Sequence, residues 1–154
     1  MAGGVLRRDT YIHVANAGPA PVDIRMVYIH GEMTGPTDWI TQPLTIPAEA
    51  PVWWSASSGS GTVAPFTTLA PLGIPDPEWA GGTRVVGFIV GWAVNDAGQP
   101  IRWDYLTADA THLNLFDQTA TAYNAYQFPT APPHTDGAAI GPPGVLSLDG
   151  TQYG

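Results

Sequence analysis

The sequence predicts an all-β fold, an antiparallel β-sandwich with extended N- and C-terminal arms. Apolar and polar residues alternate in short runs, as they do in strands with one buried face. The runs are separated by turn-forming residues, and the chain holds 18 glycines and 16 prolines among 154 residues. No amphipathic run longer than about two helical turns interrupts this pattern, and the length suits one domain.

The first two strands are expected near the start of the chain. Residues 11–15 alternate, and residues 16–20 form a turn rich in small residues. The next run places four apolar residues on one face: Val22, Ile24, Met26 and Tyr28. We therefore expect a hairpin with one solvated face.

Two weaker runs follow, at residues 39–46 and 52–56. The first contains Pro43, which cannot donate to a strand ladder, so this run is expected at a sheet edge. Residues 57–82 lose the alternation and are expected to form a long excursion.

The most apolar run, residues 85–94, is predicted to be a central strand covered on both faces. Its expected core side chains are Val86, Phe88, Val90 and Trp92, with Ile24, Met26 and Tyr28 among their neighbours. Residues 95–98 (Asn-Asp-Ala-Gly) are a strong turn signal and lead into a run at 101–106. A second hairpin joins residues 110–116 to 119–128 through Asp117 and Gln118, which makes eight or nine strands in all.

The ends of the chain are predicted to be arms outside the core. The expected organisation is an N-terminal arm (residues 1–9), a sandwich domain (10–128) and a Pro/Gly-rich C-terminal arm (129–154). Such arms gain too little burial to order themselves alone. They are expected either to lie on their own domain or to dock on a neighbouring subunit, where Pro142, Val145 and Leu148 would fill a groove.

The composition excludes several functional classes. The chain has no lysine, which rules out a P-loop and a Schiff base, and no cysteine, which rules out a thiol nucleophile, a disulfide and a thiolate metal site. Thirteen acidic residues against five arginines give a net charge of −8, which disfavours nucleic acid as a partner.

The sequence also bears on membranes and localisation. The N-terminal residues have no apolar signal-peptide core, and no later stretch has the roughly 18 apolar residues that span a bilayer. Synthesis in the cytoplasm without membrane insertion is therefore expected, after which the chain either stays there or leaves by lysis or a dedicated machine.

The residues with catalytic chemistry form no known constellation. The four histidines never occur at the i, i+2 or i, i+4 spacing of strand or helix metal sites: His13, His30, His112 and His134. The serines of residues 55–60 lack a nucleophile elbow, and no carboxylate pair has spacing that predicts a glycosidase. We expect no catalytic residue, no metal and no cofactor, and therefore a protein that is not an enzyme.

Aromatic residues are the stronger functional signal, with six Trp and six Tyr. Trp53 and Trp54 are adjacent in a strand and point to opposite faces, so one of them is expected to be exposed. Exposed Trp and Tyr anchor protein interfaces or stack on sugars. The aromatic interaction candidates are Trp53, Trp54, Trp79, Trp103, Tyr105, Tyr123 and Tyr126.

One short segment carries a resemblance. The run Asn16-Ala17-Gly18-Pro19-Ala20-Pro21-Val22-Asp23-Ile24 resembles the first hairpin of immunoglobulin-like domains in bacterial surface proteins and phage virion proteins. The resemblance covers about a dozen residues and, together with the strand pattern, implies an immunoglobulin-like or jelly-roll-like sandwich used for adhesion, decoration or assembly.

The sequence thus favours a structural subunit of a virion or other extracellular assembly, with other protein subunits as partners in a homo- or hetero-oligomer. The alternative is a module that binds cell-surface glycan through exposed Trp and Tyr.

Overall fold

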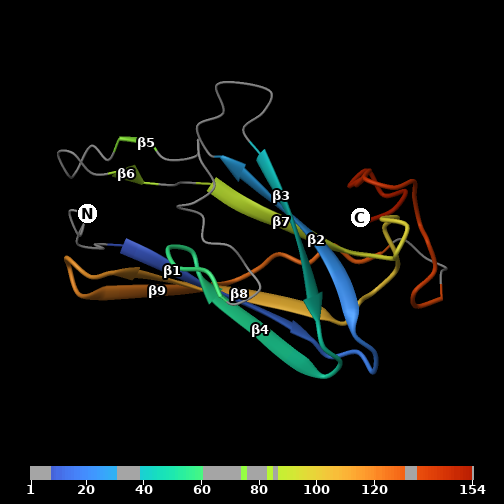
Figure 1. Cartoon of the computed structure of the whole chain (residues 1–154), viewed down its shortest axis with the longest axis horizontal. Coiled ribbons are helices and arrows are strands. Elements are labelled where there is room, and N and C mark those ends of the chain that lie inside the picture. Colours follow the sequence, from blue (N-terminus) through green and yellow to red (C-terminus); the bar gives the residue numbers. More distant parts are fainter. Residues whose placement is uncertain are drawn as a thin grey trace.

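The chain folds as a β-sandwich in the computed structural model, which describes residues 8–30, 39–60, 74–75, 83–84, 87–130 and 135–153. Two antiparallel sheets form the layers, one ordered β4-β1-β8-β9 and the other β3-β2-β7, with β5-β6 as a small separate ribbon (Figure 1). The described residues contain no helix. The strands are β1 (Arg8–Asn16), β2 (Val22–His30), β3 (Trp39–Ile46), β4 (Ala50–Ser55), β5 (Ile74–Pro75), β6 (Thr83–Arg84), β7 (Gly87–Val94), β8 (Leu106–Asn114) and β9 (Thr119–Asn124).

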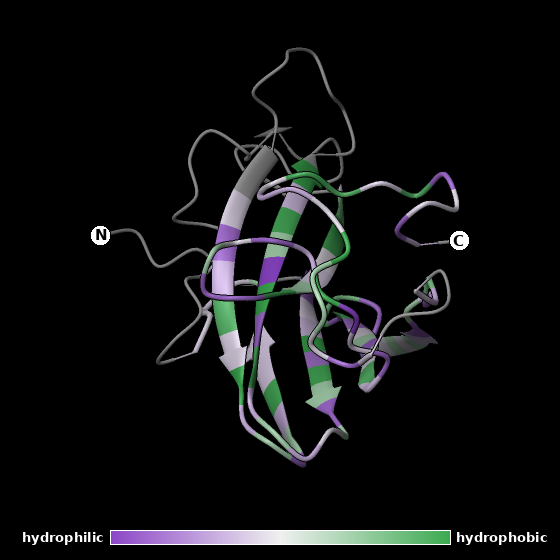
Figure 2. Ribbon diagram, turned by 90° about the vertical axis from the view of Figure 1, so that its right-hand side faces the viewer, coloured by the Kyte–Doolittle hydropathy of each residue, from purple (hydrophilic) through white to green (hydrophobic). Residues whose placement is uncertain are grey.

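The core lies between the two sheets and is built from residues of one parity on each strand. The alternation is visible as bands of opposite hydropathy along the strands (Figure 2). The predicted buried face of β2 is confirmed, because Val22, Ile24, Met26 and Tyr28 are all at most 4% exposed. They meet Ile12, Val14, Leu44, Ile46, Trp54 and Ala110 from the surrounding strands. The edge position expected for the strand with Pro43 is also confirmed, since β3 ends its sheet.

The expectation that the first two strands form a hairpin is wrong. β1 pairs with β4 and β8, whereas β2 pairs with β3 and β7, so the chain changes sheet between them. The chain changes sheet here because of Asn16, whose side chain lies inside the protein and is 1% exposed. Its amide donates to the carbonyls of Ala20 (2.8 Å) and Pro47 (3.1 Å). These bonds connect the turn to the β3–β4 connection instead of to a strand ladder.

The predicted central position of the strand at residues 85–94 is wrong, because β7 ends its sheet; of its expected core side chains, Trp92 is buried but Phe88 is not. Phe88 is 57% exposed, and β7 pairs with β2 alone among the described strands. The register aligns Phe88 with Ile29 and Trp92 with Arg25, which are the residues of β2 that point away from the core. The core face of β7 is instead the other parity, where Ile89 and Ala93 pack on the core cluster. Because this strand is apolar on both faces, its sequence has no alternation that indicates which face is buried. The fourth expected core residue, Val86, lies outside the described residues.

The turn at residues 95–98 is confirmed, but the strand expected at 101–106 is not. Gly98 has a φ of 72° and its N–H donates to the Asn95 carbonyl at 2.8 Å. The chain then crosses to the other sheet, and β8 begins only at Leu106. Trp103 lies in this crossing and donates from Nε1 to Asn16 Oδ1 at 3.0 Å. Gly18 is required here, because a Cβ would come within 2.6 Å of the Trp103 ring.

The C-terminal segment, residues 135–153, lies against its own sandwich. Its backbone follows the β7–β8 connection: the Ile140 N–H donates to the Pro100 carbonyl and the Arg102 N–H donates to the Ala138 carbonyl, at 2.9 and 3.0 Å. Tyr153 is 8% exposed, and its hydroxyl donates to the Ile101 carbonyl at 3.1 Å. Of the two arrangements open for the arm, packing on its own domain applies to this segment. The N-terminal arm lies outside the described residues except for Arg8 and Asp9, which belong to β1.

Candidate interaction surface

Strand β9 stands out from the sandwich because all six of its residues are exposed on both faces. It pairs with β8 on one side and ends its sheet on the other. The opposite sheet has three strands and this sheet has four. β9 therefore lies beyond the part of its sheet that the three-stranded sheet covers. The second predicted hairpin is thereby confirmed, and its outer strand has both faces and one edge in solvent.

The hydrogen-bonding direction of the β9 backbone follows from the register. The N–H of Ala125 donates to the Ala108 carbonyl at 2.8 Å, and antiparallel residues alternate between bonded and non-bonded pairs. Thr121 and Tyr123 therefore direct their backbone groups to β8. Ala120, Ala122 and Asn124 direct theirs outward, where no described strand pairs with them, so the sheet edge presents a row of backbone donors and acceptors.

Aromatic side chains surround this edge. Tyr123 is 57% exposed and Tyr126 is 81% exposed, and both were interaction candidates from the sequence. Tyr126 and Phe128 form an edge-to-face pair with ring centroids 5.0 Å apart. Phe116, in the β8–β9 turn, is 72% exposed. The edge and its aromatic neighbours, from Phe116 to Phe128, are called the β9 edge below.

A second surface is the outer face of the four-stranded sheet. Trp53 is 64% exposed, whereas Trp54 is 1% exposed, so the prediction that one of the pair is exposed is confirmed. The register aligns Trp53 with His13, and His13 with Asp109. The His13 and Asp109 side chains are joined by a 2.8 Å contact between Nδ1 and Oδ2. The result is a flat row with one aromatic ring beside a fixed pair of polar groups.

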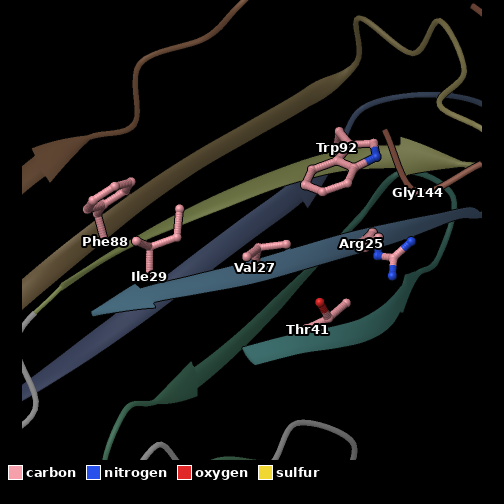
Figure 3. Close-up of a pocket in the computed structure, with 7 residues that line it drawn as sticks. All are labelled: Arg25, Val27, Ile29, Thr41, Phe88, Trp92 and Gly144. Atoms are coloured by element: carbon pink, nitrogen blue, oxygen red, sulfur yellow. The ribbon is translucent and has the colours of Figure 1, made fainter. Parts of the chain in front are cut away.

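A third surface is a groove of about 400 Å³ on the outer face of the three-stranded sheet (Figure 3). Phe88, Ile29 and Val27 lie in a row along the sheet, and the Trp92 ring and the Arg25 guanidinium lie at the other end. Trp92 is 7% exposed although it faces outward, and Gly144 of the C-terminal segment lies beside it. Its indole Nε1–H is buried without an acceptor among the described residues.

The remaining sequence candidates are dispersed. Trp103 is half-buried against the core, and Tyr105 packs edge-to-face on it at 5.4 Å. The Tyr105 hydroxyl donates to Asp136 at 2.6 Å, and this hydrogen bond together with the nearby carboxylate charge raises its pKa. Three candidates are exposed on the C-terminal segment: Pro142, Val145 and Leu148. Trp79 lies outside the described residues.

The polar clusters have structural partners. Asp9 is buried and accepts hydrogen bonds from the N–H and hydroxyl of Ser57 at 3.1 and 2.7 Å. The hydroxyls of Ser55 and Ser58 form a hydrogen bond of 2.6 Å. The hydrogen bonds described for these serines therefore join them to each other and to Asp9, and not to a histidine. His112 bonds Thr10 at 3.1 Å. Within the described part of the chain, no group of three or more His, Asp or Glu side chains converges as a metal site.

Sequence reasoning missed two features of these surfaces. The groove does not follow from the sequence, because its pattern predicts Phe88 and Trp92 in the core. The aromatic pair at the β9 edge does not follow either, because Phe128 is only the last residue of the expected strand. A usable signal was present, since residues 119–128 carry no charge and no proline, the residues that commonly protect an edge strand.

In the described ranges no helix is long and apolar enough to cross a membrane. Comparison of the chain with protein-family models, with curated proteins and with solved structures finds no match.

Proposed function

We propose that this protein is a non-enzymatic structural subunit that joins other protein chains in a virion-type or other extracellular assembly, and that the β9 edge is its joining surface. The observation that carries the proposal is a six-residue strand exposed on both faces, with outward backbone groups at its free edge. Folded proteins usually protect such edges with charge, proline or a covering element. An unprotected one is suited to strand addition by a partner, in which backbone bonds give affinity and side chains give specificity.

The aromatic residues support the same role. Tyr and Phe are enriched where interfaces are desolvated, and Tyr123, Tyr126 and Phe128 lie along one uncharged stretch. The exposed Pro142, Val145 and Leu148 of the C-terminal segment provide a second apolar contact for a neighbouring subunit.

The proposal is tested by coexpressing the untagged chain with the products of its neighbouring genes and measuring mass by light scattering. The variant Ala122→Pro removes one outward N–H and no bond to β8, so its fold should be retained. We expect multi-chain species with the native chain and a loss of at least tenfold in assembly with the variant. The matched control is Ala122→Val, which keeps the N–H and a strand-forming side chain, and it should assemble normally. A native chain that stays monomeric with every neighbour, or a Pro variant that assembles equally well, would contradict the proposal.

A second candidate function, glycan binding, is favoured by the row of Trp53, His13 and Asp109. An exposed indole face stacks on a sugar ring, while a fixed His–Asp pair accepts and donates bonds to hydroxyls. Binding to immobilised glycans that is lost in Trp53→Ala and kept in Ala122→Pro would support this function over the first.

A further inference from the structure

We infer that the partner of the β9 edge is a second copy of this chain, paired antiparallel about a twofold axis that passes Ala122. The inference rests on the proposed function, since it names the occupant of the same edge. Its consequence is a continuous sheet of eight strands, four from each copy, with the two β9 strands at its centre.

The first argument is charge. The chain carries −8 overall, so most of its surface repels a second copy. All ten residues from 119 to 128 are uncharged, so a contact between two copies of this stretch avoids that repulsion. A partner recognised through charge would need acidic or basic groups here, and residues 119–128 offer neither. Two identical uncharged edges can meet without placing like charges opposite each other.

The second argument is register. An antiparallel twofold pairing places one residue opposite itself, and the three outward residues of β9 all pair with one another only when that residue is the middle one. Ala122 is the middle of the three outward residues, so pairing it with its copy also pairs Ala120 with Asn124 of the other strand. All six outward N–H and C=O groups of each edge then find partners.

The third argument concerns the uncovered face of β9. Tyr123 aligns with Ala110, which is buried, so Tyr123 is on the side of the sheet that faces the core layer. That side is exposed at β9 because the three-stranded sheet does not reach it. In the proposed register Tyr123 lies opposite Thr121 of the second copy and diagonal to its Tyr123, within reach of an aromatic side chain. Each copy thus covers apolar surface that the other leaves open.

The absence of cysteine makes the register directly testable. In the paired strands the two Ala122 Cα atoms would be about 5.5 Å apart, within the range that a disulfide spans. The two Ala120 Cα atoms would be offset by four residues, about 14 Å, which is too far. We expect Ala122→Cys to form a covalent dimer under mild oxidation and Ala120→Cys to stay uncrosslinked. A mixture of Ala120→Cys and Asn124→Cys chains should crosslink to each other.

A charge pair provides an independent readout. Because Ala122 meets its own copy, Ala122→Lys and Ala122→Asp should each be monomeric by light scattering, while their equimolar mixture should recover the dimer. Thermal unfolding of each variant monitors its fold, and Thr45→Lys, on the far sheet, is the control that should leave dimerisation unchanged. Equal dimerisation of the separate Lys and Asp variants, or crosslinking at position 120 alone, would overturn the proposed register.

The two proposals fail in different ways. If the purified native chain is monomeric at every concentration, but Ala122→Pro abolishes assembly with coexpressed neighbours, then the edge binds a different protein and the second-copy inference is wrong. If Ala122→Pro has no effect on any assembly, the proposed function itself fails at this edge.

Discussion

Asn16 shows how a single residue determines where the chain changes sheet. It is buried, and its side-chain amide makes four hydrogen bonds: it donates to the carbonyls of Ala20 and Pro47 and accepts from the Gly18 N–H and Trp103 Nε1. This uses the donor and acceptor capacity of the amide fully. The residue therefore joins the β1–β2 turn, the β3–β4 connection and the crossing that precedes β8.

We predict that Asn16→Ala destabilises the fold by about 3 kcal/mol, because it leaves several buried polar groups without partners. Chemical denaturation of the variant and of Asn124→Ala measures this. Asn124 is exposed, so its replacement should change the free energy of unfolding by less than about 0.5 kcal/mol. Equal effects of the two substitutions would show that Asn16 does not connect these segments.

At the scale of elements, the C-terminal segment is an integral part of the sandwich edge and not a free arm. Its anchor is Tyr153, whose ring is buried and whose hydroxyl reaches the Ile101 carbonyl. An isolated bridge between Thr130 and Tyr153 also ties the segment to the chain that leaves β9. Removing the segment would take away the partners of the Pro100 carbonyl and of the Arg102 N–H in these backbone hydrogen bonds.

Alkaline pH should release this segment. Burial, with a smaller contribution from the Asp104 carboxylate, raises the pKa of Tyr153 to about 12 from 10.0, and burial raises that of Tyr28 to about 12 as well. Since the folded-state pKa lies above the unfolded value, the contribution of each tyrosine is intact below pH 10 and is lost as the pH rises to about 12.

We expect the unfolding temperature to fall between pH 10 and 12, and to fall less steeply in Tyr153→Phe, which cannot ionise there. At pH 7 the Phe variant should itself be about 1 kcal/mol less stable, because it lacks the bond to Ile101. An identical alkaline profile for the variant would mean that Tyr153 is not held in a buried site.

At the scale of the whole molecule, the order of the strands in the sheets and the buried face of β7 depend on contacts between distant residues, which the local sequence pattern does not reveal. The strands around Val22 to Tyr28 and Thr119 to Asn124 were predictable because each has a clear period or turn signal. The hairpin between β1 and β2 was wrong because Asn16 bonds to segments distant in sequence. β7 was placed on the wrong face because a doubly apolar strand has no period, and only pairing with β2 decides which face is buried.

The same limits apply to the interaction surface. An exposed residue at the Trp53–Trp54 pair followed from strand geometry alone. Exposure of both faces of β9 did not, since it arises from the unequal width of the two sheets, four strands against three. The sequence marked the aromatic residues Tyr123 and Tyr126, but the open edge beside them is a property of the folded sheet order.

Net charge yields a prediction for the assembly as a whole. Two copies of a chain with charge −8 repel over distances comparable to the Debye length, whereas the uncharged edge contact is insensitive to salt. We therefore expect self-association to strengthen several-fold when salt rises from about 0.05 to 0.5 M, as measured by sedimentation equilibrium. Weaker association at high salt would indicate a contact made by opposite charges instead.

Amide hydrogen exchange tests the joining role of the β9 edge most directly, by residue-resolved comparison of the dissociated chain with the assembled state. The account predicts that the amides of Ala120, Ala122 and Asn124 exchange rapidly in the dissociated chain and become protected on assembly. Those of Thr121 and Tyr123, which face β8, should be protected in both states. If the three outward amides exchange as fast in the assembly as in the dissociated chain, β9 is not the surface through which this protein joins its partners.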